Sequence, residues 1–161
     1  MLLLCNVTLS AANEQVSRVY IVFKTHLDVG FTDLSSVVTR RYMEEFIPKA
    51  VKVSEELAAD GSGDRYVWTT GSWLIWKYLQ TESPENVARL EKVLRRGDIV
   101  WNGVPYTVES ESMNKPLFET MLQVSHRLDQ RFGRKTIAAK MTDVPGHTRS
   151  IITPMYDAGI R

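Results

Sequence analysis

Two short polar segments of the sequence pair a histidine with an aspartate. Residues 25–31 read THLDVGF and contain His26 and Asp28, and residues 142–148 read TDVPGHT and contain Asp143. In an extended backbone, positions two apart point to the same side, so His26 and Asp28 can converge on one ion. One imidazole and two carboxylates suit zinc, at bond lengths of about 2.0–2.2 Å. A His-x-Asp pair alone is common by chance, and the second segment strengthens the prediction of a zinc site at these three residues.

The chain before each segment predicts a strand that delivers it to one edge of a sheet. Residues 19–24, VYIVFK, are a continuous β-branched and aromatic run, typical of a strand buried in a parallel sheet. Residues 136–141 predict another strand, directly before 142–148. Parallel α/β folds bind ligands beyond the carboxyl ends of their strands, so we expect both polar segments at the same edge.

The remaining sequence alternates in the same way between short apolar runs and amphipathic helices. Further strands are predicted at 66–70 and 98–101, and helices at 38–57, 72–79, 84–96, 114–132 and 149–158. Pro48 should kink or split the first helix. This order implies right-handed βαβ units around a parallel sheet, either open or closed into a barrel.

Composition excludes several classes of partner. Lys and Arg (20) nearly balance Asp and Glu (19) in the 161 residues, so no broad positive field exists to hold a nucleic acid. The single cysteine, Cys5, leaves the rest of the chain without a thiolate ligand, so a metal must be held by histidine and carboxylate. No stretch approaches the roughly 20 apolar residues of a membrane-spanning helix.

Five segments in order resemble glycoside hydrolase family 38, the retaining α-mannosidases. HLDVGF resembles the family's H-x-D-P-G-W motif, and TDVPGHT resembles its I-D-P-F-G-H-S segment. Between and after them, YVWTTGSWLIWKYL, RRGDIVWNGVPYTVESE and MYDAGI are similar to further family segments in the same order. The likeness covers about residues 18–161 and is more specific than either motif alone.

The resemblance implies a fold and a set of roles. The fold would be a seven-stranded parallel β/α barrel-type domain, as in related hydrolases and deacetylases, of which residues 13–161 would be the N-terminal part. His26 and Asp28 would be zinc ligands, and Asp143 would be both a ligand and the nucleophile of a zinc-dependent retaining glycosidase acting on α-linked mannose-like sugars. Phe31 would stack on the sugar ring. The family's fourth ligand and acid/base lie farther along than Arg161, so this chain would be an incomplete catalyst.

The sequence departs from the family pattern at several positions. Val29 replaces the family's proline, Phe31 its tryptophan, and Val144 and Pro145 its Pro-Phe, while residues 110–112 blur its Asp-Glu pair. These departures keep two alternatives open: a metal-dependent carbohydrate deacetylase, and a non-catalytic carbohydrate-binding relic. The paired-histidine metal motif usual in deacetylases is absent from the sequence.

Some residues near the motifs have two interpretations. His147 would hydrogen-bond either Asp143 or the backbone of its own loop. Glu109 and Glu111 would either line the cleft or form an exposed acidic loop. The four tryptophans, Trp68, Trp73, Trp76 and Trp101, would either form a sugar platform or, as aromatics at such spacings more often do, fill the core.

The N-terminal residues suggest where the protein works. Residues 1–12, MLLLCNVTLSAA, are apolar and end in small residues, like a clipped secretory signal that lacks its basic region. This predicts a secreted or periplasmic protein, and a cytoplasmic one if the segment is not a signal. The expected partners are a mannoside or related glycan and the C-terminal part of the same protein.

Overall fold

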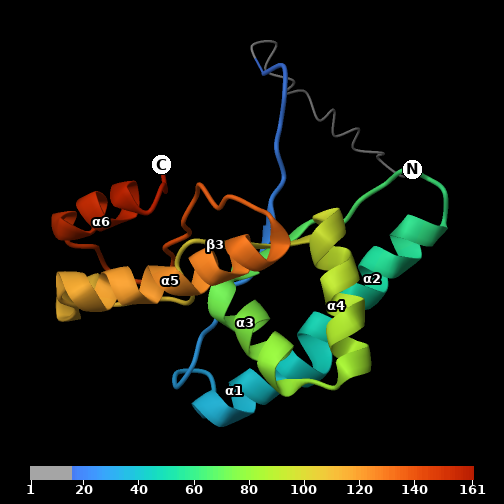
Figure 1. Ribbon diagram of the computed structural model, residues 1–161, viewed down its shortest axis with the longest axis horizontal. Helices are drawn as coiled ribbons and strands as arrows, with labels where there is room; N and C mark the ends of the chain where they lie inside the picture. The colour runs from blue at the N-terminus through green and yellow to red at the C-terminus, as the bar shows by residue number, and fades with distance from the viewer. Residues whose placement is uncertain (1–15) are drawn as a thin grey trace, which may run out of the picture.

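The computed structural model describes residues 16–161, and its centre is a small parallel sheet (Figure 1). The strands are β1 (Phe23–Lys24), β2 (Trp68–Gly71) and β3 (Ile99–Asn102), in the order β1-β2-β3. Phe23 pairs with Trp68, and Trp68 pairs with Ile99, so all three strands run in register toward one edge. Residues 1–12, and with them the predicted signal, lie outside the described residues.

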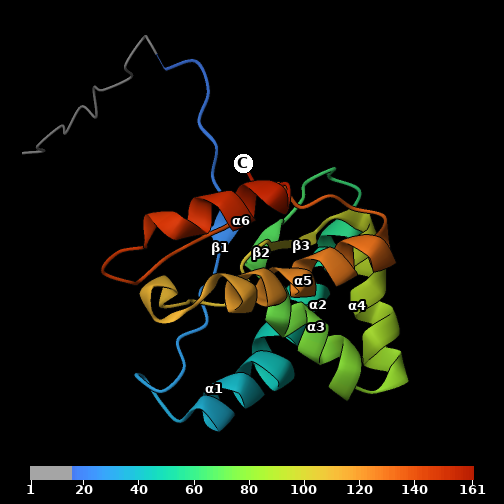
Figure 2. The same cartoon turned by 60° about the vertical axis from the view of Figure 1, so that its left-hand side comes forward.

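Helices connect the strands and cover the sheet. They are α1 (Ser35–Arg41), the π-helix η1 (Tyr42–Phe46), α2 (Ile47–Ala59), α3 (Ser72–Thr81), α4 (Pro84–Arg96), α5 (Lys115–Phe132) and α6 (Ile152–Asp157), with 3-10 turns η2 (Ser110–Ser112) and η3 (Arg149–Ile151). In Figure 2, α1 and α6 lie on opposite sides of the sheet. No helix in residues 16–161 is long and apolar enough to cross a membrane.

The expected seven-stranded barrel is wrong for the part of the chain described, because only three strands pair there. Residues 136–141 form no strand: Ala138 O accepts a 2.9 Å hydrogen bond from Gly103 N, but Lys140 N donates to the Asn102 side chain instead of to a backbone carbonyl. The run 19–24 yields only two paired residues, since 19–22 are exposed and extend past β2. The parallel α/β arrangement is confirmed, and its closure into a barrel is not.

Local signals in the sequence set the helix ends correctly. The Ser83 side chain accepts a hydrogen bond from the third helical amide of α4, and Gly97 ends that helix at φ 84°. Asn114 and Gly133 do the same for α5. The predicted helix 38–57 is interrupted by the π-helix η1 just before Pro48, whose missing N–H cannot donate to the preceding turn.

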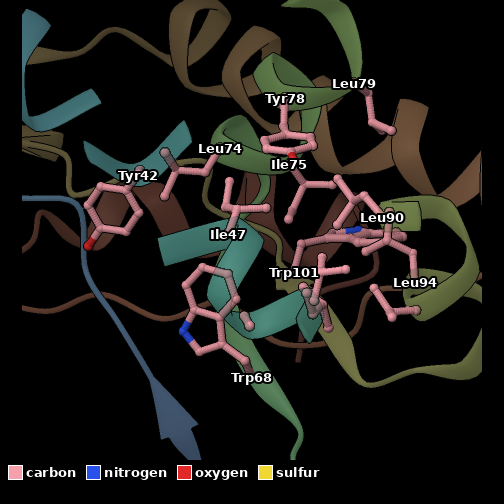
Figure 3. Close-up of a cluster of buried hydrophobic side chains, with 14 of the residues drawn as sticks. Tyr42, Ile47, Trp68, Leu74, Ile75, Tyr78, Leu79, Leu90, Leu94 and Trp101 are labelled. Carbon is pink, nitrogen blue, oxygen red and sulfur yellow. The ribbon is translucent and has the colours of Figure 1, made fainter. Parts of the chain in front are cut away.

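A hydrophobic core packs the helices against the sheet (Figure 3). Trp68 of β2 and Trp101 of β3 are buried in this core, as the second of the two interpretations of the tryptophans predicted. The side chains around them come from α2, α3 and α4, including Ile47, Leu74, Ile75, Leu90 and Leu94. A second cluster lies between α5, η3 and the loop after β3, and α5 contributes to both.

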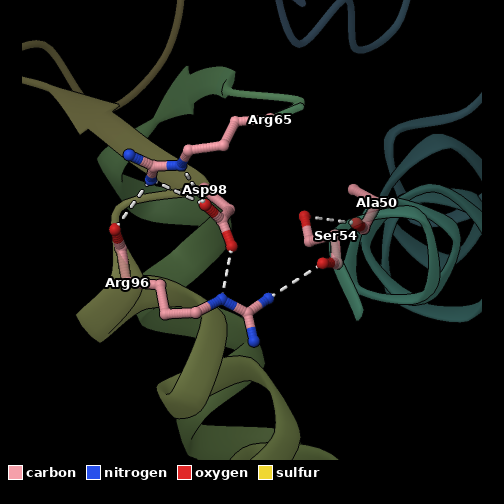
Figure 4. Close-up of polar contacts among 5 residues, drawn as sticks. All are labelled: Ala50, Ser54, Arg65, Arg96 and Asp98. Atoms are coloured by element: carbon pink, nitrogen blue, oxygen red, sulfur yellow. Dashed lines mark hydrogen bonds and ion pairs between the residues drawn. The ribbon is translucent and has the colours of Figure 1, made fainter. Parts of the chain in front are cut away.

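The amino end of β3 is fixed by a buried carboxylate (Figure 4). The Asp98 side chain is 7% exposed and accepts hydrogen bonds from Arg65 Nη2 at 2.7 Å and Arg96 Nε at 2.6 Å. Arg65 also donates to the Arg96 carbonyl, and Arg96 to the Ser54 carbonyl. Burial alone would raise the pKa of Asp98, but the two guanidinium groups outweigh it and hold the pKa below its ordinary value. The carboxylate therefore joins the start of β3 to Arg65, just before β2, and to Arg96 of α4, and Arg96 extends the link to α2.

We predict that Asp98→Asn destabilises the fold by about 2–4 kcal/mol, because it leaves two arginines without their counter-charge. About half of the Arg65 side chain is exposed to water, so the loss is smaller than for a fully buried ion pair. The depressed folded pKa means that the carboxylate stabilises the fold above its unfolded pKa of about 3.9, and that this contribution is lost as pH falls through the folded value. The free energy of unfolding of the wild type, measured with urea, should therefore decrease below about pH 4. Asp98→Asn should lose less of its free energy of unfolding over this pH range than the wild type does. Asp64→Asn, on the neighbouring loop, should behave as wild type.

Candidate metal and sugar site

The structure brings His26 and Asp143 together at the carboxyl edge of the sheet. His26 follows β1 by two residues, and its Nε2 lies 3.3 Å from Asp143 Oδ2. The two side chains are 37% and 69% exposed, so the pair stands at the surface, open to a ligand. They are 117 positions apart in the sequence, and their meeting is the central expectation from the two motifs.

A cleft of about 650 Å³ surrounds this pair. Its walls come from three loops, each following a strand or strand-like segment: 26–31, 107–109 and 143–145. Asp28 and Glu109 line it together with Asp143, so three carboxylates and one imidazole face the same space. Such a concentration of negative charge favours a cation. The cleft-lining interpretation of Glu109 therefore holds, although the residue is also exposed.

Asp143 has an unusual backbone conformation. Its φ is 64°, and it is the one non-glycine residue with positive φ among residues 16–161. This left-handed region costs most side chains free energy, and aspartate is among the few that tolerate it. Strained residues persist where the surrounding structure holds them, and they cluster at active sites and ligand sites. The backbone conformation of Asp143 is thus an uncommon one, of the kind often found at ligand sites.

Asp28 lies in the cleft but does not complete a ligand set. Among the residues described, no three His, Cys, Asp or Glu side chains come close enough together to hold one metal ion. Asp28 instead lies near the buried Tyr42, whose hydroxyl donates to His26 O at 2.9 Å. Burial of the phenol, helped by the negative charge of Asp28, raises the pKa of Tyr42. Two of the three expected ligands are thus in contact, and the third is a neighbour.

Two residues that the sequence analysis missed hold the Asp143 segment in place. Lys140 Nζ donates to Thr25 O at 2.9 Å, which ties the chain three residues before Asp143 to the residue before His26. The buried Asn102 side chain accepts from Lys140 N at 3.4 Å and donates to Thr70 O at 3.1 Å. Burial, with the nearby charge of Lys24, lowers the pKa of Lys140. The signal that could have pointed to Lys140 was the presence of a lysine inside a predicted strand.

His147 and Phe31, the two remaining predicted site residues, have different surroundings. His147 Nδ1 is 3.1 Å from Ser110 Oγ, which also accepts from Thr148 N at 3.1 Å. The histidine thus joins its own loop to η2, through a contact that is neither of the two expected for it, Asp143 and the backbone of its own loop. Its Nε2 is buried and has no hydrogen-bond partner among the residues described. Phe31 lines the cleft with its side chain 91% exposed, so its ring is free to stack.

Comparison with known proteins gives no further identification. No protein-family model matches the chain, and neither the curated proteins nor the solved structures contain a match.

We predict that Lys140→Met loosens the Asp143 loop without unfolding the protein. Methionine keeps the length of the side chain but cannot donate to Thr25 O, while removal of a partly buried charge offsets part of the loss. Amide hydrogen exchange should become faster at residues 141–148, with a change in global stability of no more than about 1 kcal/mol. Lys135→Met, at an exposed position of the same segment, should leave exchange unchanged. Equal protection in both variants would refute the role of Lys140.

Proposed function

We propose that the protein is a zinc-dependent retaining glycoside hydrolase of α-mannosidase type, with its metal at His26, Asp28 and Asp143. The 3.3 Å between His26 Nε2 and Asp143 Oδ2 carries this proposal. Two ligands on one tetrahedral zinc, at bond lengths of about 2.0–2.2 Å, stand about 3.3–3.6 Å apart. The pair therefore already has the spacing that a shared ion requires, and Asp28 must turn within the same cleft to join it.

The residues of the cleft would divide the work as follows. The Asp143 carboxylate attacks the anomeric carbon, and a C–O bond to the protein forms as the glycosidic bond breaks and the leaving group departs with the electron pair. Attack needs the charged form of Asp143. Phe31 offers an exposed ring face to the sugar. Zinc, when bound, would hold the sugar's vicinal hydroxyls and favour distortion of its ring.

The first test is zinc binding by the chain, measured by titration calorimetry and elemental analysis. We expect one zinc per chain, and His26→Ala and Asp143→Asn should each weaken binding by more than about 10–100-fold, the usual cost of losing only an outer partner of a ligand. Asparagine is chosen because it tolerates the positive φ of residue 143. Asp28→Ala should also weaken binding if its side chain turns to the metal.

Asp33→Asn is the matched control, because Asp33 follows the same motif but does not line the cleft. Its zinc affinity should equal that of wild type. Unchanged zinc stoichiometry and affinity in the His26 and Asp143 variants would eliminate the proposed metal site.

The second test identifies the nucleophile. A fluorinated mannosyl fluoride traps the covalent intermediate of a retaining enzyme, and its fluoride leaves without needing a strong acid catalyst. We expect the label on a peptide containing residues 142–149, and no label in Asp143→Asn or in the denatured protein. A label on another carboxylate would move the nucleophile, and inversion of anomeric configuration in any turnover would rule out a retaining mechanism.

A further inference from the structure

A second cleft lies directly beside the His26–Asp143 site. It has a volume of about 440 Å³, and it shares Leu27, Val29 and Thr107 with the first cleft. The two clefts adjoin at these shared residues, so a ligand bound in the first cleft lies next to the second. The volume is in the range of small-ligand sites.

Two aromatic rings give the second cleft its character. Trp73, at the start of α3, and Tyr106, in the loop after β3, line it with their ring centres 6.2 Å apart in an edge-to-face arrangement. Trp68 and Trp101 are buried in the core, so they cannot contact a ligand there. Lys77 Nζ lies 5.7 Å from the centre of the Trp73 ring and does not line this cleft.

The backbone segments that carry the two rings are held against each other. Trp73 N donates to Pro105 O at 3.3 Å. Gly71 approaches the same carbonyl so closely that a Cβ at residue 71 would lie 2.2 Å from it, closer than any side chain can fit. The start of α3 and the Pro105–Tyr106 turn are therefore locked together. A preorganised backbone loses little entropy when a ligand binds.

The rest of the lining is apolar or hydroxylated. Leu27 and Val29 are joined by the side chains of Ser35, Thr39 and Thr107, and no charged residue lines this cleft. A pyranose ring presents a C–H face that stacks on an aromatic ring and a rim of hydroxyls that exchange hydrogen bonds with Ser and Thr. This composition fits a sugar better than an anion or a charged peptide.

We propose that the cleft at Trp73 and Tyr106 is a subsite for a second pyranose ring, so that the substrate is at least a disaccharide. This inference rests on the proposed function, since it takes the first cleft as the site of the first sugar. Trp73 is then a specificity-determining residue. It contacts the second ring and has no part in metal binding.

The test compares one sugar with two at saturating zinc, by titration calorimetry. The probes are methyl α-mannoside and the sulfur-linked 1→2, 1→3 and 1→6 α-mannobioses, which resist hydrolysis. We expect at least one mannobiose to bind about five- to tenfold more tightly than the methyl glycoside, as one well-stacked ring contributes. Trp73→Ala should remove this gain, and Trp73→Phe should keep most of it.

Trp76→Ala is the matched control. Trp76 lies on the same helix, nearly one turn farther along and exposed, and it lines neither cleft. It should keep the full gain, and all three variants should bind zinc and methyl α-mannoside as wild type does. The phenylalanine variant keeps the test informative if the alanine variant is poorly folded.

Different outcomes overturn the subsite and the proposed function. If methyl α-mannoside binds but no mannobiose binds more tightly, or if the gain survives Trp73→Ala, the subsite is refuted and the first cleft stands. If a sulfur-linked p-nitrophenyl α-mannoside gains as much as the best mannobiose, the cleft takes an apolar group and the sugar assignment is wrong. If zinc or methyl α-mannoside fails to bind, the proposed function fails and the subsite fails with it.

Discussion

The hydrogen bonds of the Asn102 side chain hold together the edge of the sheet that carries His26 and Asp143. Its amide group donates to Thr70 O in β2, and its oxygen accepts from Val104 N and Lys140 N. One buried group thus joins the end of β2, the turn that leads to Pro105 and Tyr106, and the segment that leads to Asp143. A buried amide is stable only when its hydrogen bonds are made, so these three segments must keep their relative positions.

The two ends of β3 serve different purposes. At the amino end, the carboxylate of Asp98 is paired with Arg65 and Arg96, and these ion pairs stabilise the packing of helices on the sheet. At the carboxyl end, hydrogen bonds fix the loops while the side chains of His26 and Asp143 remain 37% and 69% exposed. A short sheet can therefore support an exposed, charged site, because the opposite edge holds the elements together.

The features that could be predicted from the sequence are those with local causes. Ser83 and Gly97 act on the helix between them, and their positions gave its ends correctly. The meeting of His26 with Asp143 followed from the rule that parallel strands end at one edge. The prediction of a strand at residues 136–141 was wrong for a non-local reason. The Asn102 side chain accepts the hydrogen bond from Lys140 N that a backbone carbonyl of a neighbouring strand would have accepted. Lys140 was missed for the same reason, since its partner Thr25 lies 115 positions away.

The left-handed backbone at Asp143 also limits the chemistry that evolution can place there. Glutamate carries the same charge and reaches farther, but it rarely occupies φ near 64°, whereas aspartate, asparagine and glycine do so at lower cost. Of these three, only aspartate has a carboxylate. The loop geometry therefore selects the shorter acid before any substrate is considered, and an exchange of aspartate for glutamate would require a different turn.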